Sequence, residues 1–110
     1  MAPYVPDRGD IIWLDFNPQA GREQGGRRPA LVLSPAVYNG PSGLLVCCPM
    51  TSRAKGYPFE VPVADDPPSV VLVDHVRSLD WRARRASRKD RIGDAELAMV
   101  SAKLRPLLGI

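Results

Sequence analysis

Short apolar segments alternate with turn-rich stretches over the first 80 residues of the chain. Each segment is rich in β-branched, aliphatic or aromatic residues and is bounded by Gly, Pro, Asn or Asp, which is typical of strands in a small β-rich fold. Prolines inside the fourth segment favour an edge position, where a missing N–H is tolerated. The pattern predicts five strands, at residues 9–16, 29–35, 44–51, 57–63 and 70–79.

The stretches between these segments predict loops. Residues 17–28 form a long loop with three glycines and a proline, and residues 52–56 form a shorter polar loop. Residues 37–43 and 64–69 are rich in turn-forming residues and predict turns.

The hydrophobic period changes to three or four residues near the C-terminus, which predicts a helix with one apolar face. Asp94 is expected to cap this helix, with Glu96 in its first turn, and Pro106 is expected to limit or kink it near its end. We therefore expect an α+β fold, a small antiparallel β-barrel or half-barrel closed by one helix, in a single domain over residues 1–110. The apolar face consists of Leu97, Val100, Leu104 and Leu108.

Length and composition agree with one globular domain, because 110 residues with 45% hydrophobic and 25% charged residues can form a single core. No apolar run approaches the roughly 20 residues that a membrane-spanning helix needs. The N-terminus has no pattern of a secretory signal, which favours a cytoplasmic location.

The formal net charge is +3, but the positive charge is unevenly placed. Residues 77–91 contain seven Lys or Arg and two Asp, a local net charge of +5. Such a patch fits an anionic partner, and it equally fits a solvated face that keeps the protein soluble.

Cys47 and Cys48 are neighbours, and adjacent side chains on a strand point to opposite faces. We expect both thiols to be reduced. A single histidine and the absence of a C-x-x-C motif argue against a zinc site.

The stretch "EQGGRRPALVLSP" places two arginines between a glycine pair and a proline. The glycines let the backbone approach a ligand closely, and Pro29 restricts the residue before it. A guanidinium fixed at Arg28 is suited to grip a phosphate with paired donors. The alternative is a pair of surface arginines, Arg27 and Arg28, in a turn.

The end of the third strand offers further groups for a phosphate. Thr51 is followed by Ser52, Arg53 and Lys55, which are two hydroxyls and two cations within five residues. A simple polar loop at a strand end is the alternative.

His75, the only histidine, is a candidate general acid–base because its pKa lies near neutrality, although a structural role is the alternative. Asp74 is its neighbour and would face the other way on a strand. Glu23 could act as a base or orient one of the arginines. Trp13 and Trp81 are expected in the core or an interface rather than as base-stacking platforms.

Three blocks, "YVPDRGDIIWLDFNPQAGREQGGRRPALVLSP", "TSRAKGYPFEV" and "DHVRSLDWRAR", strongly resemble the MazF/PemK family of bacterial toxins in their order and spacing. The resemblance covers nearly the whole chain. It implies an SH3-like barrel with a C-terminal helix, a homodimer, and an acidic antitoxin that covers the RNA groove. It also implies cleavage of single-stranded RNA without a metal or other cofactor, by attack of the ribose 2′-OH to leave a 2′,3′-cyclic phosphate and a 5′-OH.

The resemblance further implies roles for individual residues. Arg28 and Thr51 match the catalytic pair of the MazF branch, and Glu23 matches a loop residue implicated in activity. The PemK branch differs, because its first-loop histidine has no counterpart here. His75 stands where many members have Gln, which suggests a role in recognition. The residues expected to bind RNA are Asn17, Gln24, Arg27, Ser52, Lys55, Asp74, His75 and Arg77.

Two rival functions remain compatible with such a fold, since a fold does not fix a function. One is a non-enzymatic toxin that poisons DNA gyrase, and the other is an inactive RNA-binding barrel. The Arg28 and Thr51 pair argues against the first, because a gyrase poison has no need of it. The same pair favours activity over the second.

Overall fold

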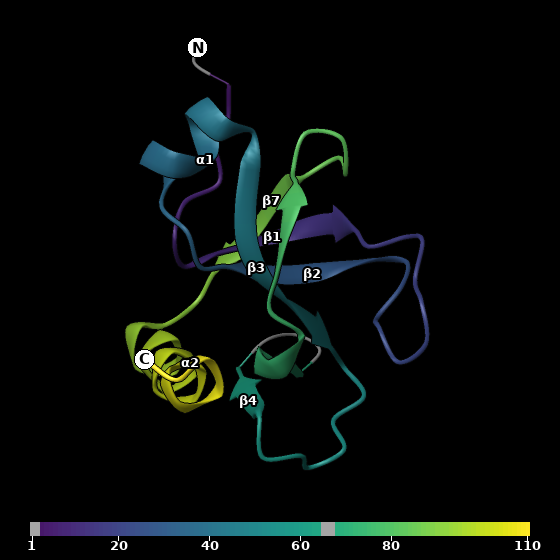
Figure 1. The fold of residues 1–110 in the computed structure, drawn as a ribbon, viewed down its shortest axis with the longest axis vertical. Coiled ribbons are helices and arrows are strands. Elements are labelled where there is room, and N and C mark those ends of the chain that lie inside the picture. Colours follow the sequence, from purple (N-terminus) through teal and green to yellow (C-terminus); the bar gives the residue numbers. More distant parts are fainter. Residues whose placement is uncertain (1–2, 65–67) are drawn as a thin grey trace.

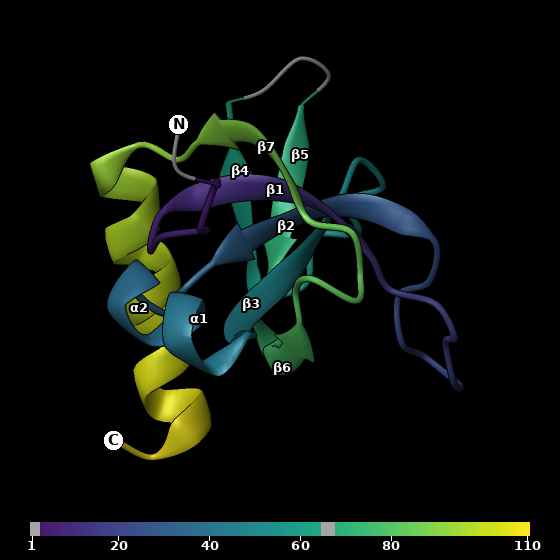
Figure 2. The same ribbon diagram turned by 90° about the horizontal axis from the view of Figure 1, so that it is seen from above.

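The computed structural model describes residues 3–64 and 68–110. One strongly curled antiparallel sheet forms its centre, and a C-terminal helix packs against one side of it (Figures 1 and 2). The strands are β1 (Asp10–Asp15), β2 (Arg27–Val32), β3 (Leu44–Thr51), β4 (Glu60–Val63), β5 (Ser69–Leu72), β6 (Arg77–Asp80) and β7 (Ser87–Arg91). The helices are α1 (Ala36–Ser42), the short 3-10 helix η1 (Val73–His75) and α2 (Asp94–Leu108). The predicted α+β class and half-barrel with a C-terminal helix are confirmed.

The curl of the sheet comes from β3, which pairs with β2 along one edge and with two different strands in turn along its other edge. Its first half pairs with β6, from Leu44 opposite Asp80 to Cys47 opposite Arg77. Its last two residues pair with β5, with Thr51 opposite Val70. The order β4–β5–β3–β2–β1–β7 therefore bends at β3, and the predicted edge position of the proline-containing β4 is confirmed.

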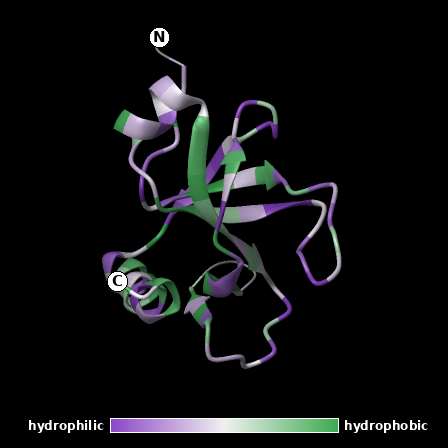
Figure 3. Ribbon diagram, viewed as in Figure 1, coloured by the Kyte–Doolittle hydropathy of each residue, from purple (hydrophilic) through white to green (hydrophobic). Residues whose placement is uncertain are grey.

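Alternation along the central strands divides the buried side chains into two clusters. Cys48 belongs to the cluster of Ile11 and Leu31, and Cys47 to the cluster of Ile12 and Ala30. Both thiols are buried and free, as the alternation predicts. Figure 3 shows the hydrophobic residues concentrated on the strands, with hydrophilic residues on the loops that join them.

Helix α2 closes the first cluster, with Val100 fully buried and Leu97 and Leu104 partly buried against it. Leu108, predicted on the same face, is 53% exposed. The predicted cap at Asp94 is wrong by one residue, because Gly93 is the N-cap.

Glu96 stabilises the start of α2 by accepting hydrogen bonds from the N–H groups of Gly93 and Ala64, at 3.3 and 3.0 Å. Pro106 lies inside the helix, which ends two residues later at Leu108, as expected from its position. Arg8, just before β1, links the N-terminal segment to α2 by donating a hydrogen bond to the Ser101 hydroxyl at 3.0 Å. Within the described residues, the helices are too short and too polar to cross a membrane.

Three sequence-based element predictions are wrong. Residues 70–79 are not one strand, because η1 interrupts them and redirects the chain from one half of β3 to the other. Residues 37–43 are not a turn, since most of them form α1, which Gly43 ends with a φ of 72°. The charged strand β7 was not predicted, because an edge strand without apolar alternation gives no hydrophobic signal. The predicted turn at 64–69 includes residues 65–67, which lie outside the described residues, and Ser69 already begins β5.

Candidate functional site

Three adjoining cavities lie around the start of β2 and the end of β3. The first, the Arg28 cavity, has a volume of about 560 Å³. The second and third, the His75 cavity and the Tyr57 cavity, have volumes of about 530 and 710 Å³. Gln24 lines all three, so the cavities form one continuous groove.

Each cavity is named after one of the residues that line it. The Arg28 cavity is lined by Trp13, Gln24, Arg27, Arg28, Pro29, Met50, Thr51, Ser52, Arg53, Ser69 and Lys89. The His75 cavity is lined by Phe16, Arg22, Glu23, Gln24, Pro49, Asp74, His75, Val76, Arg77 and Ser78. The Tyr57 cavity is lined by Arg22, Gln24, Thr51, Arg53, Lys55, Tyr57, Glu60, Leu72, Asp74 and His75.

Arg28 is held in place from two sides of its guanidinium. Its Nε donates to the Gly25 carbonyl at 2.8 Å, and its Nη1 donates to the Met50 carbonyl at 3.4 Å. The Arg28 Nη2 makes no hydrogen bond with the described residues, so it is available to a ligand. Burial, and then the nearby charge of Arg53, lower the pKa of Arg28 from its ordinary value. The sequence predicted a guanidinium held at a fixed point, and these two hydrogen bonds hold Arg28 in this way.

Thr51 lies close to Arg28. Both residues line the Arg28 cavity, and the Arg28 Nη1 donates to the carbonyl of Met50, the residue before Thr51. The Thr51 Oγ1 accepts a hydrogen bond from the Arg53 N–H at 3.2 Å. The hydroxyl can still donate its own hydrogen to a ligand, because a hydroxyl accepts and donates at once.

The charged groups in the described lining of the Arg28 cavity all carry the same sign. Arg27, Arg28, Arg53 and Lys89 line it, and its described lining contains no Asp, Glu or His. The Ser69 Oγ is buried and has no hydrogen-bond partner among the described residues. Such a cavity is suited to an anionic ligand with several oxygen atoms, which balances the positive charge of the lining.

The loop between β1 and β2 is stabilised by two residues predicted to act on RNA. The Asn17 Oδ1 accepts from the Gly26 N–H at 2.8 Å, and the Glu23 Oε1 accepts from the Ala20 N–H at 3.1 Å. Asn17 lines none of the three cavities, and Glu23 lines the His75 cavity rather than the Arg28 cavity. The structure therefore does not bring Glu23 together with Arg28 and Thr51.

Gly25 lies close to an exposed side chain of the same loop. A Cβ atom at Gly25 would lie 1.8 Å from the Gln19 Oε1, so a residue with a side chain there would displace the Gln19 side chain. The Gly25 carbonyl accepts the hydrogen bond from the Arg28 Nε. Gly25 is thus linked directly to the guanidinium.

Arg27 lines the Arg28 cavity and also joins β2 to the turn before β7. Its Nη2 donates to the Arg85 carbonyl at 2.7 Å and to the Ser87 hydroxyl at 3.2 Å. Arg85 has a φ of 59°, a left-handed conformation that is uncommon for a residue with a side chain.

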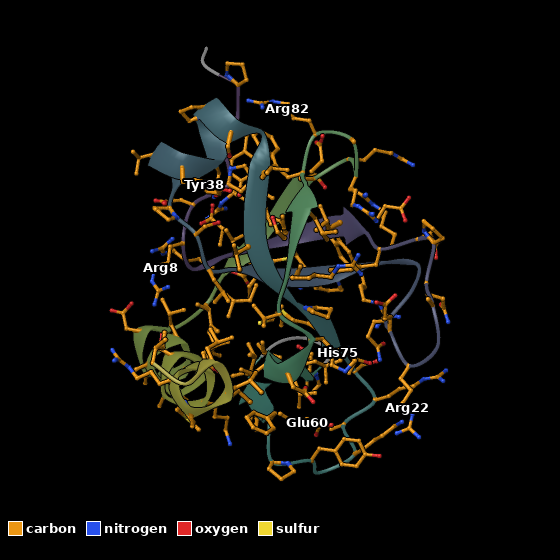
Figure 4. The ribbon with its side chains drawn as sticks, viewed as in Figure 1. Arg8, Arg22, Tyr38, Glu60, His75 and Arg82 are labelled. Atoms are coloured by element: carbon orange, nitrogen blue, oxygen red, sulfur yellow. The ribbon has the colours of Figure 1, made fainter. Side chains whose placement is uncertain are left out.

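The expectation that Asp74 and His75 face opposite ways is wrong. Both residues belong to the 3-10 helix η1 rather than to a strand, and both line the His75 and Tyr57 cavities. Figure 4 shows His75 and Arg22 at the same end of the molecule, and both line these two cavities. Arg77, at the start of β6, also lines the His75 cavity.

The loop after Thr51 takes its shape from Glu60, which the sequence did not single out. Its carboxylate accepts from the N–H groups of Lys55 and Gly56, with distances of 2.9 to 3.1 Å. The Lys55 Nζ lies 5.8 Å from the centre of the Tyr57 ring. The structure thus places Ser52 on the Arg28 cavity and Lys55 on the Tyr57 cavity.

Part of the basic stretch at 77–91 has structural partners. Arg82 lies over the Trp81 ring, Arg84 donates to the Asp15 and Asn17 carbonyls, and Arg91 pairs with Asp10 at 3.1 Å. Lys89, from the same stretch, lines the Arg28 cavity. The positive charge at 77–91 therefore serves both the fold and the groove.

Sequence reasoning missed several residues of the groove, among them Trp13, Arg22 and Lys89. Trp13 was expected in the core or an interface, but it is 37% exposed and lines the Arg28 cavity, whereas Trp81 is buried as expected. Arg22 and Lys89 were not considered as site residues, yet both line cavities. The signal that could have found Trp13 is the strand register, since Trp13 pairs with Pro29, the neighbour of Arg28.

Comparison with known proteins identifies relatives along the whole chain. The chain is 49% identical to the endoribonuclease toxin MazF of Escherichia coli K12, over 99% of each protein. It is 32% identical to the Escherichia coli endoribonuclease PemK, over 93% of this chain and 81% of that protein.

Solved structures give the same result. A crystal structure of MazF from Deinococcus radiodurans superposes with a TM-score of 0.93 at 60% identity and covers 98% of this chain and 100% of that one. A MazE–MazF structure from the same organism superposes with a TM-score of 0.86 at 55% identity, over 98% of this chain and 99% of that one. A family model described as a PemK-like, MazF-like toxin of type II toxin–antitoxin systems matches residues 7–108. The chain therefore belongs to this family of toxins.

Proposed function

We propose that this protein is the toxin of a type II toxin–antitoxin system and acts as a sequence-specific endoribonuclease on single-stranded RNA. The observation that carries the proposal is the Arg28 cavity, where the guanidinium groups of Arg27, Arg28 and Arg53 meet the Thr51 hydroxyl. The family membership and the endoribonuclease names of the relatives at 49% and 32% identity support it.

The proposed reaction is attack of a ribose 2′-oxygen on the adjacent phosphorus. The bond from 2′-O to phosphorus forms, the bond from phosphorus to 5′-O breaks, and the products are a 2′,3′-cyclic phosphate and a 5′-OH. One proton leaves the 2′-OH and one is delivered to the 5′-oxygen. The phosphorane between these states carries extra negative charge, which preorganised cationic donors stabilise most strongly.

Arg28 is the residue proposed to stabilise this charge. Its guanidinium is fixed by the Gly25 and Met50 carbonyls, so it needs no reorganisation as the charge develops. Thr51 is proposed to orient a phosphate oxygen with its hydroxyl hydrogen, because its Oγ1 is already occupied as an acceptor. An arginine is poorly matched to proton transfer near neutral pH, and the lowered pKa of Arg28 reduces this mismatch.

Glu23 is proposed to act at a distance from the reacting phosphate. It accepts the Ala20 N–H and lines the His75 cavity, so it holds the loop that carries Gly25 and Gln24. Its contribution to activity would then come through the position of this loop.

RNA sequence is proposed to be read in the other two cavities. Single-stranded RNA is recognised by base stacking and by hydrogen bonds to base edges. Asp74, His75 and Arg77 offer an acceptor, an imidazole and a guanidinium around one cavity, and Gln24 connects it to the Arg28 cavity. Trp13 is proposed as a stacking surface beside the reacting phosphate, since its ring is partly exposed there.

The proposed partners are a second copy of this chain and an acidic antitoxin that covers the groove. The Deinococcus radiodurans relative forms a MazE–MazF complex. The positive groove described here would attract an acidic peptide for the same reason that it would attract RNA. The proposed place of action is the cytoplasm, where mRNA is available.

The proposal is tested by incubating the purified protein with long unstructured RNAs in excess EDTA and mapping the product ends. Discrete cuts that leave a 2′,3′-cyclic phosphate and a 5′-OH would support the proposed reaction and its independence from metal ions. No cuts in RNAs that cover all short sequences would reject it and would favour a binding function such as gyrase poisoning.

A further inference from the structure

Arg53 stands at the junction of two cavities. It lies two residues after Thr51, on the loop that leaves β3, and it lines both the Arg28 cavity and the Tyr57 cavity. Its side chain is exposed and makes no hydrogen bond or ion pair with the described residues. It therefore contributes nothing visible to the stability of the fold.

The backbone of Arg53 is nevertheless fixed. Its N–H donates to the Thr51 Oγ1 at 3.2 Å, which closes a tight turn directly after β3. The Cα of Arg53 is thereby held relative to Thr51, and its side chain begins from a defined point beside the reaction centre.

The electrostatics at this point are unfavourable without a ligand. The charge of Arg53 is close enough to Arg28 to lower the pKa of Arg28. Arg27 adds a further cation to the same lining. Like charges gathered in this way destabilise the empty site, and an anionic ligand removes the repulsion.

One phosphate does not account for all of these charges. Arg28 lies close to Thr51, and these two residues define the place of the reacting phosphate. Arg53 extends from there into the Tyr57 cavity, which it shares with Asp74 and His75. An RNA strand that runs from the reaction centre into this cavity carries a further phosphate past Arg53.

We infer that Arg53 is a second phosphate-binding residue, which grips the phosphate adjacent to the reacting one and so sets the register of the RNA over Arg28 and Thr51. This inference rests on the proposed function and specifies how its substrate is held. Arg53 is a positioning residue in this account, since it touches the substrate away from the atoms that react.

The first test compares Arg53→Gln with Arg88→Gln. Arg88 is a matched control, because it lies next to Lys89 on β7, is exposed and lines none of the three cavities. For a short RNA with one cleavage site, Arg53→Gln is expected to raise KM by roughly tenfold and to leave kcat within about threefold. The salt dependence of log KM should decrease by about 0.7, as for one lost phosphate contact on a single strand.

The second test removes the charge from the RNA instead. Substrates carry a neutral methylphosphonate at one linkage on either side of the reacting phosphate. At one of these positions the wild-type protein should lose roughly tenfold in affinity, whereas Arg53→Gln should lose less than twofold. Arg88→Gln should respond as the wild type does. An equal loss in Arg53→Gln and wild type at every linkage would overturn the inference.

Binding measurements separate this inference from the proposed function. The same neutral linkages are placed in an analogue with 2′-deoxyribose at the cleavage site, which binds but cannot be cut. A protein that cuts RNA normally but shows no coupling between Arg53 and any linkage would contradict the inference alone. A protein that cuts no RNA would contradict the proposed function, and the coupling measured by binding would still decide whether Arg53 grips a phosphate.

Discussion

At the scale of single residues, the groove contains side chains that are held by hydrogen bonds within the protein and still have a donor available to a ligand. Arg28 uses Nε and Nη1 for the fold, and Thr51 uses only its acceptor capacity. Both residues thus present donors toward the same cavity without losing their own support. This is the arrangement that a transition state with growing negative charge requires.

Thr51 provides the simplest test of this point. Thr51→Val keeps the β-branched shape that suits a strand but removes the hydroxyl, so cleavage should fall by roughly 10- to 100-fold through kcat. Thr51→Ser should retain most of the activity. Single-turnover rates of the three proteins, with melting temperatures as a control for folding, measure the effect. Equal rates for Val and wild type would remove Thr51 from the mechanism.

His75 is expected to act on recognition rather than rate. It lines two cavities beside the Arg28 cavity but not the Arg28 cavity itself. His75→Gln should therefore change which RNA sequences are cut more than it changes the maximal rate. Sequencing the product ends from a mixed RNA pool measures this. A large loss of rate at an unchanged cleavage site would instead make His75 catalytic.

The buried thiols give a prediction for pH. Burial raises the pKa of Cys47 to about 12, so the neutral thiol is favoured in the folded protein. The corresponding stabilisation is present below about pH 9, the ordinary thiol pKa, and is lost as the pH rises toward 12. At pH 8 a thiol reagent should modify neither cysteine in the native protein and both in denaturant. Rapid reaction of the native protein would show that the two core clusters open easily.

At the scale of elements, the sequence pattern predicted the core strands because they alternate in hydrophobicity, and it failed where other forces decide. η1 contains the polar pair Asp74 and His75 between two apolar segments. It interrupts the predicted strand because β5 and β6 pair with different parts of β3. β7 is charged throughout, and its pairing with β1 gives no hydrophobic signal. α1 depends on the buried Asn39, whose amide donates to the Pro6 and Ser34 carbonyls, a long-range requirement invisible in local pattern.

The turn before β7 contains a strained residue that permits a stability test. Arg85 adopts a φ of 59°, which costs about 1–2 kcal/mol for a residue with a Cβ. Arg85→Gly relieves this strain but adds freedom to the unfolded chain, so the free energy of unfolding should rise by roughly 0.5–1 kcal/mol, or about 3–6 °C in Tm. Arg85→Ala, which keeps the Cβ, is the control and should not stabilise. A lower Tm for Gly than for Ala would show that the turn is not strained.

At the scale of the whole molecule, the groove is assembled from parts that are distant in the sequence. The β1–β2 loop, the end of β3, the loop after it, η1 and β7 all contribute to it. The sequence identified Arg28 and Thr51 through their local surroundings and through resemblance to a family. It could not place Lys89, because the position of this residue depends on strand pairing across more than 50 residues of chain. It also could not show that Glu23 and Asn17 stabilise their own loop.

The central claim is that Arg28 stabilises the reacting phosphate in a cationic cavity. The most direct measurement is the single-turnover rate of RNA cleavage in EDTA by Arg28→Ala, with Arg88→Gln as the charge-matched control and with melting temperatures recorded for each protein. We expect Arg28→Ala to lose about 100-fold or more in rate with little change in Tm, and Arg88→Gln to stay within about threefold of the wild type. A rate for Arg28→Ala within threefold of the wild type would contradict the account.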